Sequence, residues 1–184
     1  AIRWMETFPA VPGLGNLHSR FAFNSNWLVI NAFFSFSFLG IRSFHVLPGV
    51  FLLVSMSYLM EGTAKLLQKE ITVASVIKTL LIPLVFYTIG SQISSPGTDF
   101  PATIWTWITF SLWIEAIKIK VKPQQNAIGL EEILVYIFSV YLITVKLSTI
   151  PLLLLSAFLL IKYVRKNTKM VIKLLILALI ILAP

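Results

Sequence analysis

Hydrophobic positions along the chain fall into six long apolar stretches separated by polar connections. These stretches are rich in Leu, Ile, Val and Phe, and they cover residues 47–60, 79–93, 102–117, 133–145, 150–161 and 173–183. Within a lipid bilayer only helices and closed barrels satisfy all their backbone groups, so we expect these segments to be helical. The pattern predicts an all-α fold, a polytopic transmembrane helical bundle over residues 44–184. Its helices, about six in number, are expected near residues 46–61, 77–93, 102–117, 131–146, 149–164 and 170–184.

The composition agrees with a membrane protein. The chain is 58% hydrophobic and 12% charged, with a mean hydropathy of +0.90, whereas an average soluble domain is about 45–50% apolar and about 25% charged. There is no cysteine, which excludes disulfides and thiolate metal sites. The two histidines, His18 and His45, lie far apart in the chain and do not have the spacing of a His-based metal site.

Basic residues are sorted to alternate connections between the apolar stretches. Eleven of the fifteen Lys and Arg residues lie in or beside three connections: Lys65, Lys69, Lys78, Lys118, Lys120, Lys122, Lys162, Arg165, Lys166, Lys169 and Lys173. Cytoplasmic loops collect Lys and Arg, so we expect residues 62–78, 118–130 and 165–169 inside a bacterial inner (cytoplasmic) membrane. Residues 1–43 and 94–101 are then extracytoplasmic. This sorting, with contact to anionic lipid, explains the net charge of +8 without nucleic-acid binding.

The amino-terminal segment differs from the rest of the chain. Asn24 and Ser25 are N-cap candidates for an aromatic helix over residues 27–39. That helix would be about 20 Å long, against a hydrocarbon core of about 30 Å. We therefore expect it to lie along the outer leaflet or dip into it as a juxtamembrane or re-entrant helix. A short tilted span is the alternative.

Several short runs resemble known membrane enzymes. Residues 23–27 (FNSNW) and 36–48 (FSFLGIRSFHVLP) resemble a recurring block in polytopic glycosyltransferases of the GT-C class, such as protein mannosyltransferases and lipid A aminoarabinose transferases. Those two groups have a His-Pro-Pro-like motif where this chain has Asn24 and Ser25. Further runs are similar to bacterial multi-pass proteins of this class whose substrates are uncharacterised: AIRWME (1–6), VPGLGNLHSR (11–20), SSPGTDFP (94–101) and TVKLS (144–148).

The resemblance implies a polyprenyl-phosphate-linked sugar donor and an acceptor on the outer face. The class usually carries its catalytic carboxylate on the first external loop, which would fall upstream of Ala1. We therefore expect the chain to be a fragment of a longer protein that holds part of the site.

Two charged residues are the main candidates for chemistry on the outer side. Asp99 lies in a Pro-constrained connection, where a carboxylate could take the acceptor proton or hold a divalent metal ion; the alternative is that it caps the following helix. Lys146 closes an apolar stretch, and with Ser148 and Thr149 it could bind the donor phosphate. The alternative for Lys146 is that it snorkels to the membrane interface.

The remaining candidates come from the amino-terminal segment. Arg3 and Arg20 join Lys146 as donor-phosphate ligands, because Arg binds phosphate bidentately. Four residues are candidates for substrate binding: Asn16, His18, Asn24 and His45. We expect Arg3, His18 and Arg20 to converge with Asp99 and Lys146 around an outer cavity. Glu61 and Glu115 are expected near the inner face, away from such a site.

Two functions fit these features. The first is a membrane glycosyltransferase that transfers a sugar from a polyprenyl-phosphate-linked donor to a surface glycan, lipid or protein on the extracytoplasmic face. The alternative is a non-catalytic flippase for lipid-linked glycan, or a membrane scaffold subunit. A flippase needs polar residues running through the bundle, and the apolar stretches contain few. Sugar, acceptor, metal requirement and oligomeric state have no signature in the sequence.

Overall fold

The computed structural model describes residues 25–36, 39–40, 46–92, 97–118, 129–164 and 167–182. All regular elements within these residues are helices: α4 (Asn26–Phe33), α5 (Leu47–Leu67), α6 (Val73–Gln92), α7 (Asp99–Lys118), α8 (Leu130–Val145), the 3-10 helix η3 (Leu147–Leu152), α9 (Leu153–Val164) and α10 (Thr168–Leu182). The all-α class expected from the sequence is confirmed.

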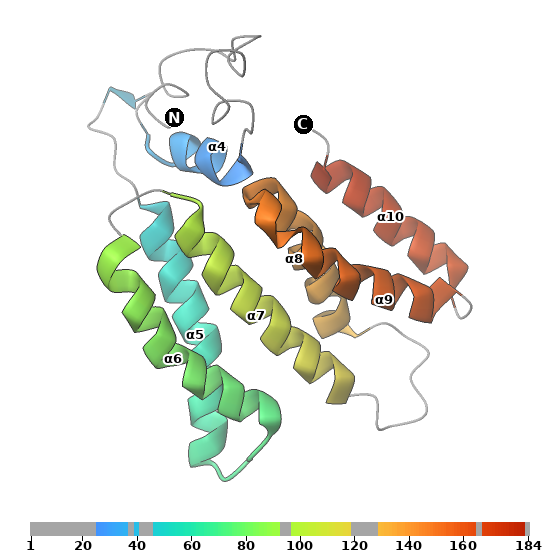
Figure 1. Ribbon diagram of the computed structural model, residues 1–184, viewed down its shortest axis with the longest axis horizontal. Helices are drawn as coiled ribbons and strands as arrows, with labels where there is room; N and C mark the ends of the chain where they lie inside the picture. The colour runs from blue at the N-terminus through green and yellow to red at the C-terminus, as the bar shows by residue number, and fades with distance from the viewer. Residues whose placement is uncertain are drawn as a thin grey trace.

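Helices that follow one another along the chain pack side by side (Figure 1). Contacts join α5 with α6, α6 with α7, α7 with α8, and α8 with both α9 and α10. One cluster of buried residues connects them: Leu59, Val85, Phe100, Ile104, Ile108, Leu112, Val135, Tyr136, Val140, Leu159 and Leu174. The bundle thus has two ends. One end carries α4, the start of α7 and the end of α8, and the other carries the α5–α6 turn.

Helices α5 and α6 are longer than the apolar pattern suggests. Helix α5 continues past the expected residue 61 to Leu67, and a turn at Lys69, whose φ is +64°, then reverses the chain. Helix α6 begins at Val73 instead of 77, because the Thr72 hydroxyl accepts a hydrogen bond from the Ser75 amide, as an N-cap does. Paired polar groups therefore extend both helices beyond the apolar residues.

Helix α4 corrects the expectation of a helix over residues 27–39. It ends at Phe33 and is followed by a turn in which Phe36 has φ +56°. Its eight residues make it about 12 Å long. Trp27 is only 2% exposed and packs against the ends of α7 and α8, and Figure 1 shows α4 lying across this end of the bundle.

Ser25 occupies the expected N-cap position of α4 but does not cap the helix with its side chain. Its hydroxyl donates a 2.8 Å hydrogen bond to the carbonyl of Val145, the last residue of α8. The short helix is thereby attached to the bundle. The expectations for residues 1–24 and 41–45, including the N-cap role of Asn24, lie outside the described residues.

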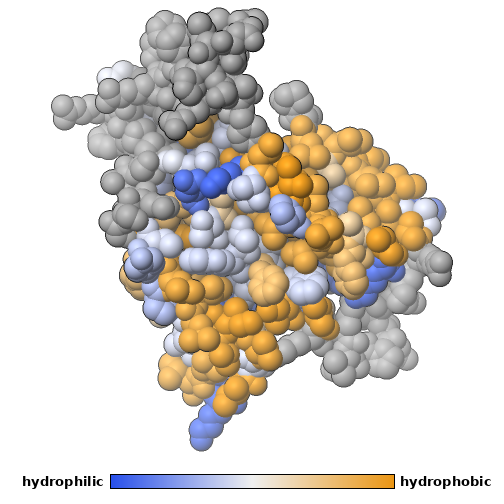
Figure 2. Space-filling model, in the orientation of Figure 1, coloured by the Kyte–Doolittle hydropathy of each residue, from blue (hydrophilic) through white to orange (hydrophobic). Residues whose placement is uncertain are grey.

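The outer surface of the helices is strongly apolar. Figure 2 shows apolar residues over much of one face, with hydrophilic residues at the tip where α5 turns into α6. Large hydrophobic side chains on α6, α9 and α10 are exposed, among them Tyr87, Leu154 and Leu179. Within the described residues, two helical segments are long and apolar enough to cross a membrane, Leu47–Leu67 and Leu147–Val164, and Val73–Ile89 is a shorter apolar helix. The sequence pattern predicts about six spans, so beyond these two segments the polytopic bundle stays a prediction.

Candidate functional site

Asp99 and Lys146 form an ion pair at the end of the bundle that carries α4. Asp99 is the first residue of α7, and Lys146 separates α8 from η3. The Lys146 Nζ atom lies 2.5 Å from the Asp99 Oδ1 atom. The Lys146 side chain is 39% exposed and that of Asp99 is 67% exposed, so the ion pair lies at the surface. Two residues 47 positions apart in the chain therefore share one location.

The backbone at Lys146 is held on both sides of the residue. Its amide donates to the Leu142 carbonyl at 2.9 Å, which completes the last turn of α8. Its own carbonyl accepts hydrogen bonds from the Thr149 hydroxyl at 2.7 Å and from the Thr149 amide at 3.1 Å. The backbone of Lys146 is extended between these two contacts, with φ −152° and ψ 125°. Only the flexible side chain is left to change position.

The position of Asp99 suits a negative charge. In the first turn of α7, its carboxylate lies near the positive end of the helix dipole. Pro101 also belongs to this first turn, where the missing N–H of proline removes no helical hydrogen bond. The local sequence thus starts a helix and presents a carboxylate at its tip.

A partly polar cavity of about 340 Å³ lies beside Lys146, between the start of α7 and η3. Its lining includes Thr103, Thr106, Trp107, Lys146, Ser148 and Thr149. The Thr106 hydroxyl donates to the Ala102 carbonyl, so its oxygen is left to accept a hydrogen bond. Because the Thr106 and Thr149 hydroxyls already donate to carbonyls, the groups that suit an anionic ligand are the Lys146 ammonium and the Thr103 and Ser148 hydroxyls.

A second cavity, of about 450 Å³, is almost wholly apolar. It lies between α4, α5, α7 and α8, and its aromatic lining includes Trp27, Phe51, Tyr58, Trp105, Phe138 and Tyr141. The ring centroids of Phe51 and Trp105 are 5.3 Å apart, and those of Trp105 and Tyr141 are 5.0 Å apart. Such a lining fits a hydrocarbon chain.

The structure brings together the two candidate site residues that it describes, Asp99 and Lys146. The other six candidates lie outside the described residues: Arg3, Asn16, His18, Arg20, Asn24 and His45. Their convergence on the Asp99–Lys146 pair stays a prediction, as do the catalytic and phosphate-binding roles of the pair itself.

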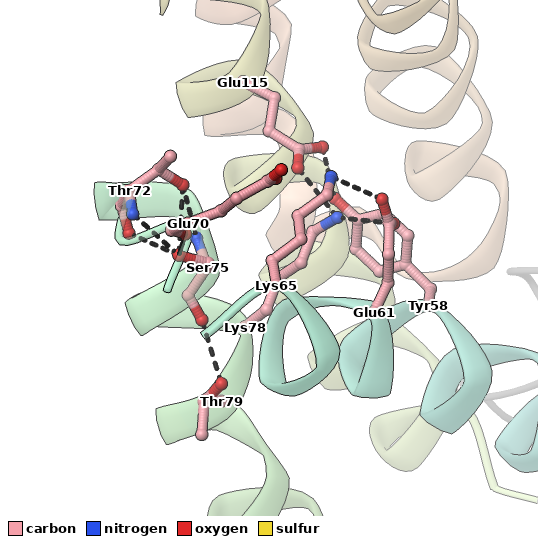
Figure 3. Close-up of polar contacts among 9 residues, drawn as sticks. All are labelled: Tyr58, Glu61, Lys65, Glu70, Thr72, Ser75, Lys78, Thr79 and Glu115. Atoms are coloured by element: carbon pink, nitrogen blue, oxygen red, sulfur yellow. Dashed lines mark hydrogen bonds and ion pairs between the residues drawn. The ribbon is translucent and has the colours of Figure 1, made fainter. Parts of the chain in front are cut away.

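A buried charge cluster at the opposite end of the bundle was not predicted from the sequence (Figure 3). Lys78 of α6 is 1% exposed, and its Nζ atom lies 3.0 Å from Glu61 Oε2 on α5 and 2.8 Å from Glu115 Oε1 on α7. The same ammonium lies 3.8 Å from the centroid of the Tyr58 ring, and the Tyr58 hydroxyl donates to Glu115 at 3.1 Å. One cation thus links three helices.

One sequence signal could have revealed this cluster. Gly62 lies inside α5, where glycine is unfavourable, and it faces Lys78 with no room for a Cβ atom. A glycine inside a helix, next to a charged residue such as Glu61, indicates that another helix packs closely there. Glu61 and Lys65, one turn apart on α5, also form an ion pair at 2.5 Å, which is the usual spacing for a helical pair.

Glu132 forms a third polar contact that joins the start of α8 to the end of α9. The Tyr163 hydroxyl donates to Glu132 Oε2 at 2.6 Å, and Lys162 Nζ lies 3.6 Å from Glu132 Oε1. Glu132 also accepts a hydrogen bond from the Gly129 amide, which caps α8. This contact is structural in character.

The described residues contain no group of three His, Cys, Asp or Glu side chains that could hold a metal ion. No curated protein and no solved structure matches the chain. A family model described as a domain of unknown function, DUF8201, matches residues 1–184. Because this model matches the chain from residue 1 to residue 184, the chain belongs to the DUF8201 family.

Proposed function

We propose that this chain is part of a multi-pass membrane glycosyltransferase similar to the GT-C class. It transfers a sugar from a polyprenyl-phosphate-linked donor to an acceptor on the extracytoplasmic face. The observation that carries the proposal is the contact between Asp99 and Lys146 beside the partly polar cavity. It joins a carboxylate and a phosphate-binding cation, the two charges that glycosyl transfer needs.

The chemistry assigns different tasks to the two side chains. The acceptor hydroxyl attacks the anomeric carbon of the donor, and the bond from this carbon to the phosphate oxygen breaks. The phosphate leaves with the bonding electron pair, and the acceptor proton passes to a carboxylate. Asp99 accepts the proton, and the Lys146 ammonium neutralises the charge that develops on the leaving phosphate. In the alternative role, Asp99 would hold a divalent metal ion that neutralises the leaving phosphate.

The distribution of acidic residues favours Asp99 for this role. Among the described residues, the other carboxylates lie toward the opposite end of the bundle: Glu61, Glu70, Glu115, Glu131 and Glu132. Three of them are held in ion pairs there, with Lys78, Lys65 or Lys162. Asp99 is thus the described carboxylate beside the outer cavity.

Two helical segments are long and apolar enough to cross a membrane, and we propose that the other helices of the bundle cross it as well. We place α5, α6, α7, α8, η3–α9 and α10 across an inner membrane, with the α4 end outside. Lysines at the α5–α6 and α9–α10 turns support this orientation through the positive-inside rule. Exposed apolar residues along the helices would contact lipid, and the apolar cavity supports a partner with a hydrocarbon chain.

A flippase or scaffold subunit is the competing function. A flippase would need a polar path through the middle of the bundle. Two buried serines there are satisfied locally: Ser139 and Ser156 bond to each other, and the Ser139 hydroxyl also contacts the Val135 and Tyr136 carbonyls. Closed contacts of this kind support the enzyme over a transport path.

The proposal is tested with the full-length protein in cells. Asp99→Asn should abolish most of the surface product and raise the level of polyprenyl-linked sugar, both measured by mass spectrometry of lipid extracts and surface glycans. Glu70→Gln is the matched control, since it makes the same charge change on an exposed turn residue. Wild-type product levels in Asp99→Asn, at equal protein amounts, would refute the role of Asp99.

A further inference from the structure

We propose that Lys146 exchanges ion-pair partners during the reaction. In the resting protein it holds the Asp99 carboxylate, and when the lipid-linked donor binds it turns into the adjoining cavity to bind the donor phosphate. The exchange frees the Asp99 oxygen for the acceptor hydroxyl. This inference rests on the proposed function and adds a substrate-dependent control of the same site.

The position of Lys146 between two environments is the first support. Lys146 belongs both to the ion pair and to the lining of the partly polar cavity, whereas Asp99 is not among the residues that line that cavity. A phosphate in the cavity and the Asp99 carboxylate would therefore approach the same ammonium from different sides. Each of them can be its partner.

The hydrogen bonds around Lys146 are the second support. Hydrogen bonds with the Leu142 carbonyl and with the Thr149 hydroxyl and amide fix its backbone, as described above. Its side chain is partly exposed and carries the ammonium on a flexible four-carbon stem. A change of partner therefore needs rotation about side-chain bonds only. Helices α7 and α8 can stay in place.

The strength of the resting ion pair is the third support. An exposed lysine–carboxylate pair contributes little free energy, because water screens it. The cavity offers a phosphate hydrogen-bond donors besides the ammonium, since the Ser148 and Thr103 hydroxyls also line it. As the sugar leaves, a phosphodiester becomes a monoester and gains negative charge, which favours the contact with Lys146 further.

Binding of farnesyl phosphate to the purified full-length protein in detergent tests the exchange. Calorimetric titrations at low ionic strength compare it with farnesol, which has the same chain and no phosphate. Asp99→Asn should bind farnesyl phosphate about two- to fivefold more tightly than the wild type, because the competing carboxylate charge is gone. Lys146→Met should bind it at least about tenfold more weakly.

The double variant Lys146→Met/Asp99→Asn distinguishes a partner exchange at Lys146 from a general effect of the altered net charge on phosphate binding. With Lys146 replaced by Met, the Asp99→Asn substitution should have no further effect, since the two side chains act through one contact. Glu70→Gln and Lys169→Met repeat the two charge changes at exposed positions away from the site and should leave binding unchanged. Farnesol should bind all variants alike.

The possible failures are distinguishable. If Lys146→Met binds farnesyl phosphate as the wild type does, the phosphate site and with it the proposed function are wrong. If Lys146→Met weakens binding while Asp99→Asn leaves it unchanged or weaker, the phosphate site stands and the partner exchange is wrong. Equal melting temperatures of the variants show that neither substitution has unfolded the protein.

Discussion

Gly62 on α5 and Lys78 on α6 face each other so closely that a Cβ atom at Gly62 would collide with the Lys78 side chain and lie 2.9 Å from the Ser75 carbonyl oxygen. This contact fixes the distance between the two helices of the α5–α6 hairpin. It also explains why Lys78, which the close packing covers, can be almost fully buried.

Gly62→Ala should therefore destabilise the protein. Overpacking typically costs about 1–3 kcal/mol, which exceeds the gain of up to about 1 kcal/mol from the better helix propensity of alanine. Thermal unfolding in detergent measures the effect. Gly49→Ala, near the start of the same helix, is the matched control, because nothing lies within 4 Å of its added methyl group. A Gly62→Ala protein as stable as Gly49→Ala would contradict the close packing.

Lys78→Met should be among the most destabilising single substitutions in the described part of the chain. It leaves Glu115, whose side chain is 19% exposed, without its cation, whereas Glu61 keeps its ion pair with Lys65. Breaking a buried pair in this way costs about 3–5 kcal/mol. Lys65→Met removes a partly exposed partner of Glu61 and should cost about 1 kcal/mol or less.

A compensating substitution tests the cause. Adding Glu115→Gln to Lys78→Met removes the carboxylate charge that has lost its cation, so it should restore part of the lost stability. Chemical unfolding in detergent gives both values. If the double variant is no more stable than Lys78→Met, lost packing and not charge explains the effect.

Ser25→Ala should loosen α4 from the bundle. The lost hydrogen bond to Val145 is worth about 1 kcal/mol, and α4 is too short to be a stable helix alone. Hydrogen exchange should rise for the amides of α4 and stay unchanged in α8. Ser57→Ala, which removes an exposed bond within α5, should leave exchange in α4 unaltered. Unchanged protection of α4 in Ser25→Ala would mean that Trp27 alone holds it.

The membrane orientation can be read by labelling single cysteines, since the natural chain has none. A membrane-impermeant maleimide should label Thr98→Cys in intact cells, because the proposed orientation puts the start of α7 outside. Asn167→Cys, between α9 and α10, should react only after the membrane is permeabilised. Labelling of position 167 in intact cells would reverse the orientation.

Much of the secondary structure could be predicted from the sequence, because a long apolar segment in apolar surroundings satisfies its backbone groups by forming a helix. The starts of α8 and α10 lie within two residues of the expected positions, whereas the ends of α5 and α4 differ by about six residues from expectation. Those two ends depend on contacts that no local pattern contains. Paired charges extend α5 beyond its apolar residues, and the backbone reverses at Phe36 after α4.

The sequence could predict that Asp99 and Lys146 lie close together, because the order of the helices determines which helix ends meet. Asp99 starts one helix and Lys146 follows the next, so antiparallel packing of α7 and α8 brings them to the same end. The Lys78 cluster needed more information. Its members lie on three helices, and which faces of α5, α6 and α7 meet depends on tertiary packing, which single-helix periodicity does not reveal.

The bridge from Lys78 to Glu115 also constrains how the protein is made. Glu115 is synthesised after Lys78, and at about 5–20 residues per second the delay lasts a few seconds. During that interval the α5–α6 hairpin holds its lysine with the Tyr58 ring and with Glu61 as the one carboxylate partner. Under the proposed membrane placement, we expect the hairpin to remain beside the insertion machinery until α7 arrives, so that these three helices enter the lipid as one unit.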